Sequence, residues 1–516
     1  MKTRGLFLSA LMLGAVMAGC SNEEVLNNDF QKPDGNEYYM AVNIFSSGTA
    51  SRAANDFAAA SDAEVAVNNA VFYFLDEAGN SCAEPYMYNK SLELSASGHH
   101  EDSDDKEATP IIVMKNPTTN PSSIVTFLNV PVGFAFQDYD SLSELQAIAG
   151  DYRENANGFV MSNSVYADGE NVVIGAPVSA DNIYKTRQEL EVGVQNNSAV
   201  AVPIHVERVL AKVNVEDYVG EDVSNNEVSL DGEANTVINV SIDGWWLHNA
   251  KEESYMVKSL DPESYTGTWW NDAANLRSYW AESYNADLEG GSWSNNVDTP
   301  IYCHENTETS LKKATHLVVA ATLSVGADED GTTLVRWRNA YYTEEGFKTA
   351  FLNNFLSAHK YYYQVAENQY ETITVDMLDF AFNTEEEQVT EKDYEAIVTL
   401  NTTEELYTLS GTTATPVDAS VVEDKLEGFA TVKLWNGGKT YYFLPIAHLE
   451  GSEANAIVRN HVYQMNLNSV SGLGTPVPNA DKVIVPEKVE GDELSYIAAS
   501  VYVLKWKVVE NNVDLN

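Results

Sequence analysis

Short runs of β-branched and aromatic residues, separated by turn-forming residues, recur along most of this 516-residue chain. In the first half they lie at residues 71–75, 111–114, 124–130, 172–174 and 204–215. Runs of this length and composition are typical of strands in a β-sandwich. The pattern therefore predicts a mainly β protein. Because one hydrophobic core rarely serves more than about 300 residues, two domains are expected.

One early run stands next to an isolated arginine. In residues 38–45 the apolar side chains of Met40, Val42 and Ile44 alternate with others, which predicts a half-buried strand. Small and polar residues flank Arg52 on both sides. No other arginine lies between Arg4 and Arg153. Such a segment predicts an exposed loop that a protease can enter.

The second half contains further runs of strand-forming residues, at 237–242, 317–323, 333–337, 430–435 and 441–446. The Asn-Gly-Gly-Lys-Thr segment at 436–440 predicts a short hairpin between the last two runs. Residues 219–235 turn to Asp, Glu, Asn, Gly and Ser, which predicts the domain boundary.

Two helices interrupt the strands. Ser141 and Glu144 have the spacing of a capping box, and Gly150 is expected to end that helix. The second helix is predicted at about residues 344–359. Its buried face carries aromatic residues at a four-residue spacing, Phe347, Phe351 and Phe355.

The first twenty residues have the form of a bacterial lipoprotein signal. Lys2 and Arg4 precede an apolar run at 6–17, and Ala-Gly-Cys follows with Cys20 as its last residue. The run is too short to span a bilayer, so it predicts a cleaved leader and an acylated Cys20. The alternative is an ordinary signal peptide with an incidental cysteine. The polar residues 21–35 predict a flexible tether.

Charge and cysteine content limit the possible partners. With 77 acidic against 30 basic residues the net charge is −47, which disfavours binding to nucleic acid. Cys82 and Cys303 could form one disulfide in an oxidising compartment, but they lie far apart in the sequence. Two buried thiols are therefore expected.

Catalytic motifs are missing from the sequence. There is no G-x-S-x-G, H-E-x-x-H, P-loop or C-x-x-C pattern, so we expect no enzyme and no cofactor. His99 and His100 stand beside the acidic residues Glu101, Asp102, Asp104 and Asp105, a group that could bind a cation. They lack the glycine of a calcium loop, so a solvated acidic loop is expected and no metal site.

A tryptophan-rich stretch supports a rival function. Its members are Trp269, Trp270, Trp280 and Trp293. Exposed aromatic rings of this kind could stack on sugars, as in a surface glycan-binding lipoprotein. Tryptophan is more often largely buried, which favours a structural role.

Several motifs in one order along the chain resemble the fimbrillins of Bacteroidales-type bacteria. They are the leader with Cys20, the Arg52 junction, and the segments ERVLAKV (207–213), YCHENT (302–307), VRNHVYQMNL (458–467), GLGT (472–475) and YVLKWKVV (502–509). None of these motifs is catalytic. The resemblance implies a structural subunit of a cell-surface fimbria.

The resemblance also implies an architecture and a maturation route. It implies two transthyretin-like β-sandwich domains with a few short helices, at 53–225 and 226–516, after a leader at 1–20 and a tether with a removable strand at 21–52. The precursor would be an outer-membrane lipoprotein, cut by an Arg-specific protease between Arg52 and Ala53. A lipid-retained anchor or accessory subunit is the alternative.

Polymerisation would then proceed by strand exchange with other copies and accessory subunits. Removing the strand at 38–45 would open a groove, and an extended tail from a neighbour would fill it. In the tail of this chain the apolar residues Val509, Val513 and Leu515 share one parity and are the expected donor residues. A frayed C-terminus is the alternative.

Overall fold

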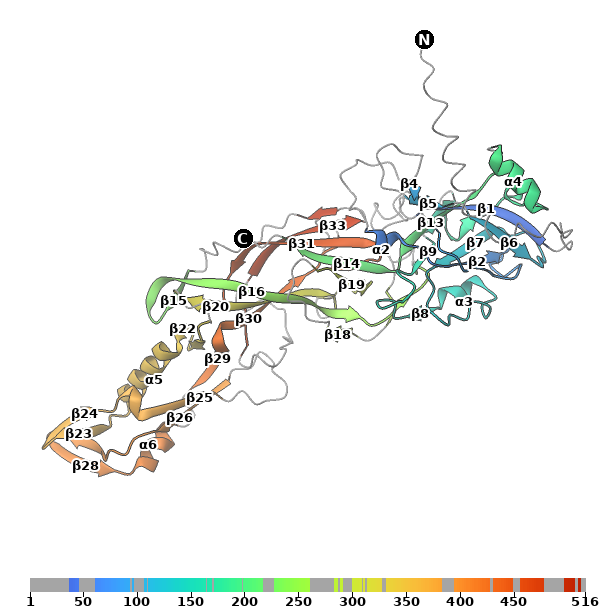
Figure 1. Ribbon diagram of the computed structural model, residues 1–516. Helices are drawn as coiled ribbons and strands as arrows, with labels where there is room; N and C mark the ends of the chain where they lie inside the picture. Colours follow the sequence, from blue (N-terminus) through green and yellow to red (C-terminus); the bar gives the residue numbers. More distant parts are fainter. Residues whose placement is uncertain are drawn as a thin grey trace, which may run out of the picture.

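The computed structural model is mainly β, with several sheets and few helices, which confirms the predicted fold class (Figure 1). The transthyretin-like form of the two sandwiches stays a prediction. The structure describes residues 37–45, 61–92, 95–96, 106–108, 110–163, 165–168, 171–196, 198–216, 227–259, 283–285, 288–290, 299–308, 310, 313–326, 331–382, 394–400, 401–426, 430–448, 455–477, 496–505 and 509–511.

The N-terminal lobe comprises the described residues from 37 to 208. Its main sheet has the order β3-β2-β7-β9-β13-β1-β5-β4, with β6 also paired to β1 and β12 to β7. The elements are β1 (Glu37–Phe45), α2 (Asp62–Val65), β2 (Ala70–Leu75), β3 (Tyr86–Tyr88), β4 (Ser95–Ala96), β5 (Lys106–Ala108), β6 (Ile111–Lys115), β7 (Ser123–Leu128), α3 (Leu142–Gln146), β8 (Ala149–Gly150), β9 (Met161–Asn163), β10 (Val165–Asp168), β11 (Asn171–Ile174), β12 (Ala176–Pro177), η1 (Ala180–Asn182), α4 (Arg187–Gln195) and β13 (Val202–Arg208).

The central lobe comprises the described residues at 210–325 and 436–511. Its first elements are β14 (Leu210–Glu216), β15 (Glu227–Leu230), β16 (Glu233–Lys251), β17 (Ser254–Tyr255), β18 (Leu288–Gly290), β19 (Ile301–His304) and β20 (His316–Val325). Its last are η4 (Asn436–Gly438), β30 (Lys439–Pro445), β31 (His461–Ser471), β32 (Thr475–Pro476), β33 (Tyr496–Lys505) and β34 (Val509–Asn511). One sheet has the order β19-β14-β31-β33-β34. The other contains the 19-residue strand β16, which pairs with β20.

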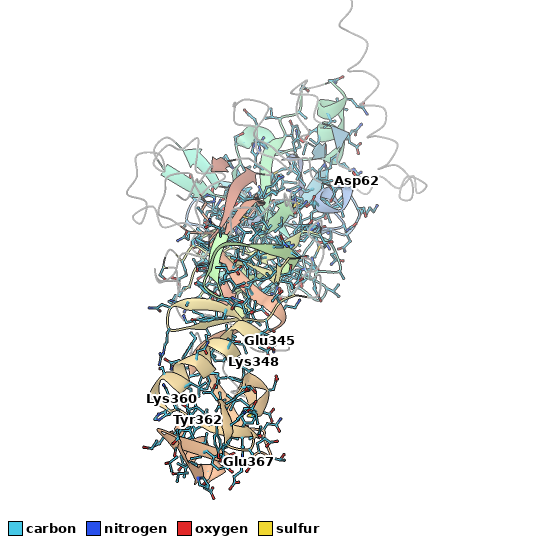
Figure 2. All side chains as sticks on the ribbon, turned by 90° about the vertical axis from the view of Figure 1, so that its left-hand side faces the viewer. Asp62, Glu345, Lys348, Lys360, Tyr362 and Glu367 are labelled. Atoms are coloured by element: carbon cyan, nitrogen blue, oxygen red, sulfur yellow. The ribbon has the colours of Figure 1, made fainter. Side chains whose placement is uncertain are left out.

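The distal lobe comprises the described residues at 334–435. Its elements are β21 (Leu334–Trp337), β22 (Ala340–Thr343), α5 (Glu344–Ala358), β23 (Tyr362–Ala366), β24 (Gln369–Thr372), η3 (Val375–Met377), β25 (Leu378–Phe382), β26 (Tyr394–Leu400), β27 (Leu406–Ser410), β28 (Thr413–Val417), α6 (Ala419–Leu426) and β29 (Thr431–Trp435). Figure 2 shows Glu345 and Lys348 on α5 and Glu367 near the tip of this lobe, far from Asp62 of the N-terminal lobe.

The long sheet has two buried faces because side chains alternate along a strand. In β16 the adjacent residues Trp245 and Trp246 point to opposite sides. Trp245 joins the core of the central lobe, whereas Trp246 joins the core of the distal lobe. The distal core also contains Phe347, Phe351 and Phe355, all fully buried, which confirms the predicted face of α5.

One predicted strand proves to be two. Residues 204–215 form the end of β13 and most of β14, which pair in different sheets. The ladder breaks at Val209, whose amide donates instead to the carbonyl of Val160. Because β14 pairs with β19 and β31 of the central lobe, the change of sheet falls between Arg208 and Leu210, before the composition change at 219–235.

One predicted hairpin and one predicted helix end also differ from the structure. The segment at 436–440 does not close a hairpin, because β29 pairs with β21 and β26 while β30 pairs with β20 and β32. It carries the chain from one part of the sheet to another. The helix capped by Ser141 ends at Gln146 rather than at Gly150, which belongs to β8.

Candidate functional site

β1 lies in the interior of the N-terminal sheet. On one side it runs parallel to β13, with Val42 opposite Val202 and Ile44 opposite Ile204. On the other side it runs antiparallel to β6 and β5. Both edges of β1 are therefore hydrogen-bonded.

The side chains of β1 are part of the core. Met40, Val42 and Ile44 are fully buried and belong to one hydrophobic cluster, as their alternation predicts. Burying a side chain of this size stabilises a fold by about 1.5–3 kcal/mol. The N-terminal lobe without β1 would thus expose an apolar slot with unpaired backbone groups on two sides.

The C-terminal strands lie at one edge of the central lobe. β33 pairs with β31 over its whole length, and β34 pairs with β33 as the last strand of the sheet. Val509 is in β34, opposite Val503. Cys20, Arg52, Ala53, Val513 and Leu515 lie outside the described residues, as do the four tryptophans at 269, 270, 280 and 293.

Three of the sequence motifs meet where the N-terminal and central lobes join. Arg459 and Glu305 are both fully buried and form an ion pair, with Nη2 and Oε1 2.5 Å apart. Arg459 also donates to the carbonyls of Tyr255 and Met256 and to Ser254 Oγ. One guanidinium thus fixes the β17 segment against β19, which explains a buried arginine in this motif.

A second buried pair lies beside the first. Lys258 Nζ is 3.3 Å from Glu207, and both side chains are almost fully buried. Burial raises the pKa of Glu207, and the charges of Lys258 and Arg459 oppose that rise. The pair joins the end of β13 to the segment that follows β17, so it links the two lobes.

A third contact reaches from the N-terminal lobe into the central sheet. Glu64 Oε1 accepts from Lys212 Nζ at 3.0 Å and from the Tyr302 hydroxyl at 2.8 Å. Burial works against ionisation of Glu64, yet hydrogen bonds from the Ser61 amide, Tyr302 and Lys212 lower its pKa. Arg208 Nε donates to the carbonyl of the same glutamate, at 2.7 Å.

His304 makes a hydrogen bond between lobes that requires a neutral ring. Its Nε2 accepts from the Tyr152 amide at 3.0 Å, and its Nδ1 lies 3.1 Å from the carbonyl of Lys251. Burial lowers the pKa of His304 to about 4. The hydrogen bonds of Glu64, Glu207 and His304 thus join the two lobes.

The junction motifs were identified in the sequence because they resemble segments of fimbrillins. Their role in joining the two lobes was not predicted. Sequence reasoning missed Glu64 and Lys258, which belong to none of the motifs. The capping-box spacing of Ser61 and Glu64 was a local signal for α2, and the structure contains that box. No local pattern identifies Lys258 as the partner of Glu207, because 51 residues separate them.

Cys82 and Cys303 are free and buried, as predicted, and burial raises the pKa of Cys303 to about 12. Within the described residues, no three His, Cys, Asp or Glu side chains are arranged to hold a metal ion. Nor does any helix in the described ranges have the length and apolar character needed to cross a membrane.

Comparison with solved structures gives low similarity over long alignments. A candidate cell adhesion protein from Parabacteroides distasonis is 15% identical, with 92% of this chain and 98% of that chain covered and a TM-score of 0.36. One from Bacteroides eggerthii is 11% identical, with 93% and 98% covered and a TM-score of 0.37. A fimbrial assembly protein from Parabacteroides distasonis is 11% identical, with 57% and 83% covered and a TM-score of 0.29.

No curated protein matches the chain. Residues 433–512 match the family model described as major fimbrial subunit protein type IV, fimbrillin, C-terminal. This segment contains β30 to β34, hence the Arg459 motif and the edge of the central sheet. This part of the chain is therefore similar to the C-terminal part of fimbrillins.

Proposed function

We propose that this protein is a fimbrillin-type structural subunit of a cell-surface fimbria and that it polymerises after proteolysis. The precursor is exported as a lipoprotein acylated at Cys20, and an Arg-specific protease cuts it between Arg52 and Ala53. β1 then leaves the N-terminal lobe, and the C-terminal tail of a neighbouring subunit takes its place. The observation that carries the proposal is the position of β1, which is paired on both edges and precedes a lone arginine.

Cleavage would lower the effective concentration of β1 at the slot, although the contacts of β1 in the slot would stay the same. While the chain is intact, β1 is tethered and its effective concentration at the slot is high, of the order of millimolar for a short linker. After the cut β1 is a separate molecule that can diffuse away. A tail from another subunit can then compete for the same backbone groups.

The tail is long enough to span the slot. Residues 506–516 follow β33, whereas β1 has nine residues. β34 pairs with β33 through three residues only, so releasing it breaks few contacts. Donor residues Val509, Val513 and Leu515 would replace the apolar side chains of β1. A role of this kind needs no catalytic group.

Substitution of Arg52 tests the cleavage step. We expect Arg52→Ala to abolish the polymer ladder on unboiled gels and to leave the precursor acylated, because the protease loses its recognition residue. Arg52→Lys is the matched control for charge, and it should also block an Arg-specific protease. N-terminal sequencing of the wild-type protein should give Ala53.

Two results would contradict this proposal. A normal ladder from Arg52→Ala would show that cleavage at this site is not required. An acylated Cys20 at the start of the protein in assembled fimbriae would instead support a lipid-retained anchor or accessory subunit. The glycan-binding alternative predicts retention of the precursor on a polysaccharide column.

A further inference from the structure

The face of β1 that points away from its core is also covered. Ala41 is 1% exposed although it lies on the side opposite Met40 and Val42. It belongs to a different face from the cluster that buries those two residues. The helix α4 lies against β1 (Figure 1). We call the described residues 182–196 and 198–200, which include α4, the lid.

Hydrogen bonds join the two ends of the lid to each other and join the lid to β1. Asn182 Nδ2 donates to the carbonyl of Val200 at 2.9 Å, and the Val200 amide donates to the Tyr184 hydroxyl at 3.2 Å. Tyr184 and Tyr39 exchange two backbone hydrogen bonds, of 2.8 and 2.9 Å. The lid therefore loses two backbone partners whenever β1 leaves.

The lid has its own buried residue. Leu190 of α4 is fully buried, while Val192 on the same helix is 47% exposed. Leu190 belongs to none of the main hydrophobic clusters, and the same is true of Ala41. A small side chain at position 41 leaves room for a helix to approach the strand closely.

The proposed donor tail does not match this arrangement. At the positions of the opposite parity the tail carries Glu510, Asn512 and Asp514, so a polar or charged residue would face the lid. In the place of Ala41, which is 1% exposed, each of these larger polar side chains would need room that the closed arrangement does not offer. A strand from a neighbour can therefore fill the core side of the slot, but it cannot leave the lid closed.

We propose that the lid is a conformational switch, closed over β1 in the uncut subunit and opened when a neighbour's tail replaces β1. This inference rests on the proposed strand exchange. The closed lid holds β1 in place and delays premature polymerisation. The open lid exposes Leu190 and gives the carboxylates of the tail access to water.

Thiol labelling of a cysteine in the lid tests the switch. In Leu190→Cys the new thiol should be protected from a maleimide reagent in the precursor, and should react about tenfold faster or more in the polymer. Val192→Cys, on the exposed side of the same helix, is the matched control and should react quickly in both states. The native Cys82 and Cys303 are buried and give a low background.

Limited proteolysis of the wild-type protein provides a second measurement that needs no substitution. Trypsin should cut after Lys185 or Arg187 faster in the polymer than in the precursor. Polymers in which Leu190→Cys stays protected and the lid stays resistant would overturn the switch and leave strand exchange intact. If cut subunits do not polymerise at all, the proposed function itself fails.

Discussion

At the residue scale, the buried ion pair between Arg459 and Glu305 shows when buried charges can be accommodated in a fold. Two ions removed from water lose several kcal/mol of hydration each, and their attraction offsets this loss only when the remaining donors and acceptors are also satisfied. Arg459 meets that condition through Glu305, Ser254 and two carbonyls. The pair holds the β17 segment within the central lobe, and β17 in turn pairs with β8 of the N-terminal lobe.

Removing one partner of that pair should be costly. We expect Arg459→Leu to lower the free energy of unfolding by about 3–5 kcal/mol, because Glu305 is left buried without its partner. The double variant Arg459→Leu/Glu305→Leu should recover part of the loss, as urea denaturation would measure. In contrast, Arg187→Ala removes an exposed pair with Glu191 and should cost roughly 0.5 kcal/mol or less.

An equal loss in the single and double Leu variants would contradict this account. It would mean that the hydrogen bonds of Arg459 to the β17 segment, and not the uncompensated charge of Glu305, determine the stability of the junction.

At the element scale, α5 begins with a capping arrangement that spans two segments. Thr343 accepts from the Gly346 amide at 3.0 Å, and its own amide and hydroxyl donate to Asp231, which follows β15. The carboxylate lies so close to the helix that a Cβ added at Gly346 would overlap Asp231 Oδ1. The glycine is thus explained by its neighbour and not by its backbone angles.

Gly346→Ala should therefore reverse the usual effect of that substitution. Alanine in place of glycine normally stabilises a helix by about 0.5–1 kcal/mol. Here we expect a loss of about 1–2 kcal/mol, comparable to losing a helix cap, because Asp231 must move away from Thr343. Thermal unfolding monitored by tryptophan fluorescence would measure it. In an Asp231→Ala background the same change should be neutral or stabilising, and a loss there would contradict the explanation.

Local sequence patterns predicted individual helices and strands, but they did not predict which strands pair. Alternation at 38–45 predicted β1, and the spacing of three phenylalanines predicted α5. The run at 204–215 gave no sign that its halves enter different sheets, because apolar alternation is the same in both. The turn residues at 436–440 were equally compatible with a hairpin, and only long-range pairing excludes it.

At the scale of the whole molecule, the chain separates the proposed receptor from the proposed donor. The slot of β1 lies in the N-terminal lobe, while β33 and β34 belong to the central lobe, with the charged junction between them. A rigid junction would keep the tail at a fixed distance from the slot of its own subunit. Such an arrangement favours insertion of the tail into the slot of a neighbouring subunit over insertion into the slot of its own subunit. A head-to-tail polymer requires insertion between subunits.

The tail provides the most direct test of that arrangement. Replacing Val513 and Leu515 together with Asp should abolish polymer formation, because two unpaired charges would enter the apolar slot of the neighbour. The melting temperature of the precursor should not change, since a donor segment contributes nothing to the core of its own subunit. Asn512→Asp/Asn516→Asp adds the same two charges at positions of the opposite parity, and it should still polymerise. Intact polymer from the Val513/Leu515 variant, or a large drop in its melting temperature, would assign the tail to the fold of its own subunit.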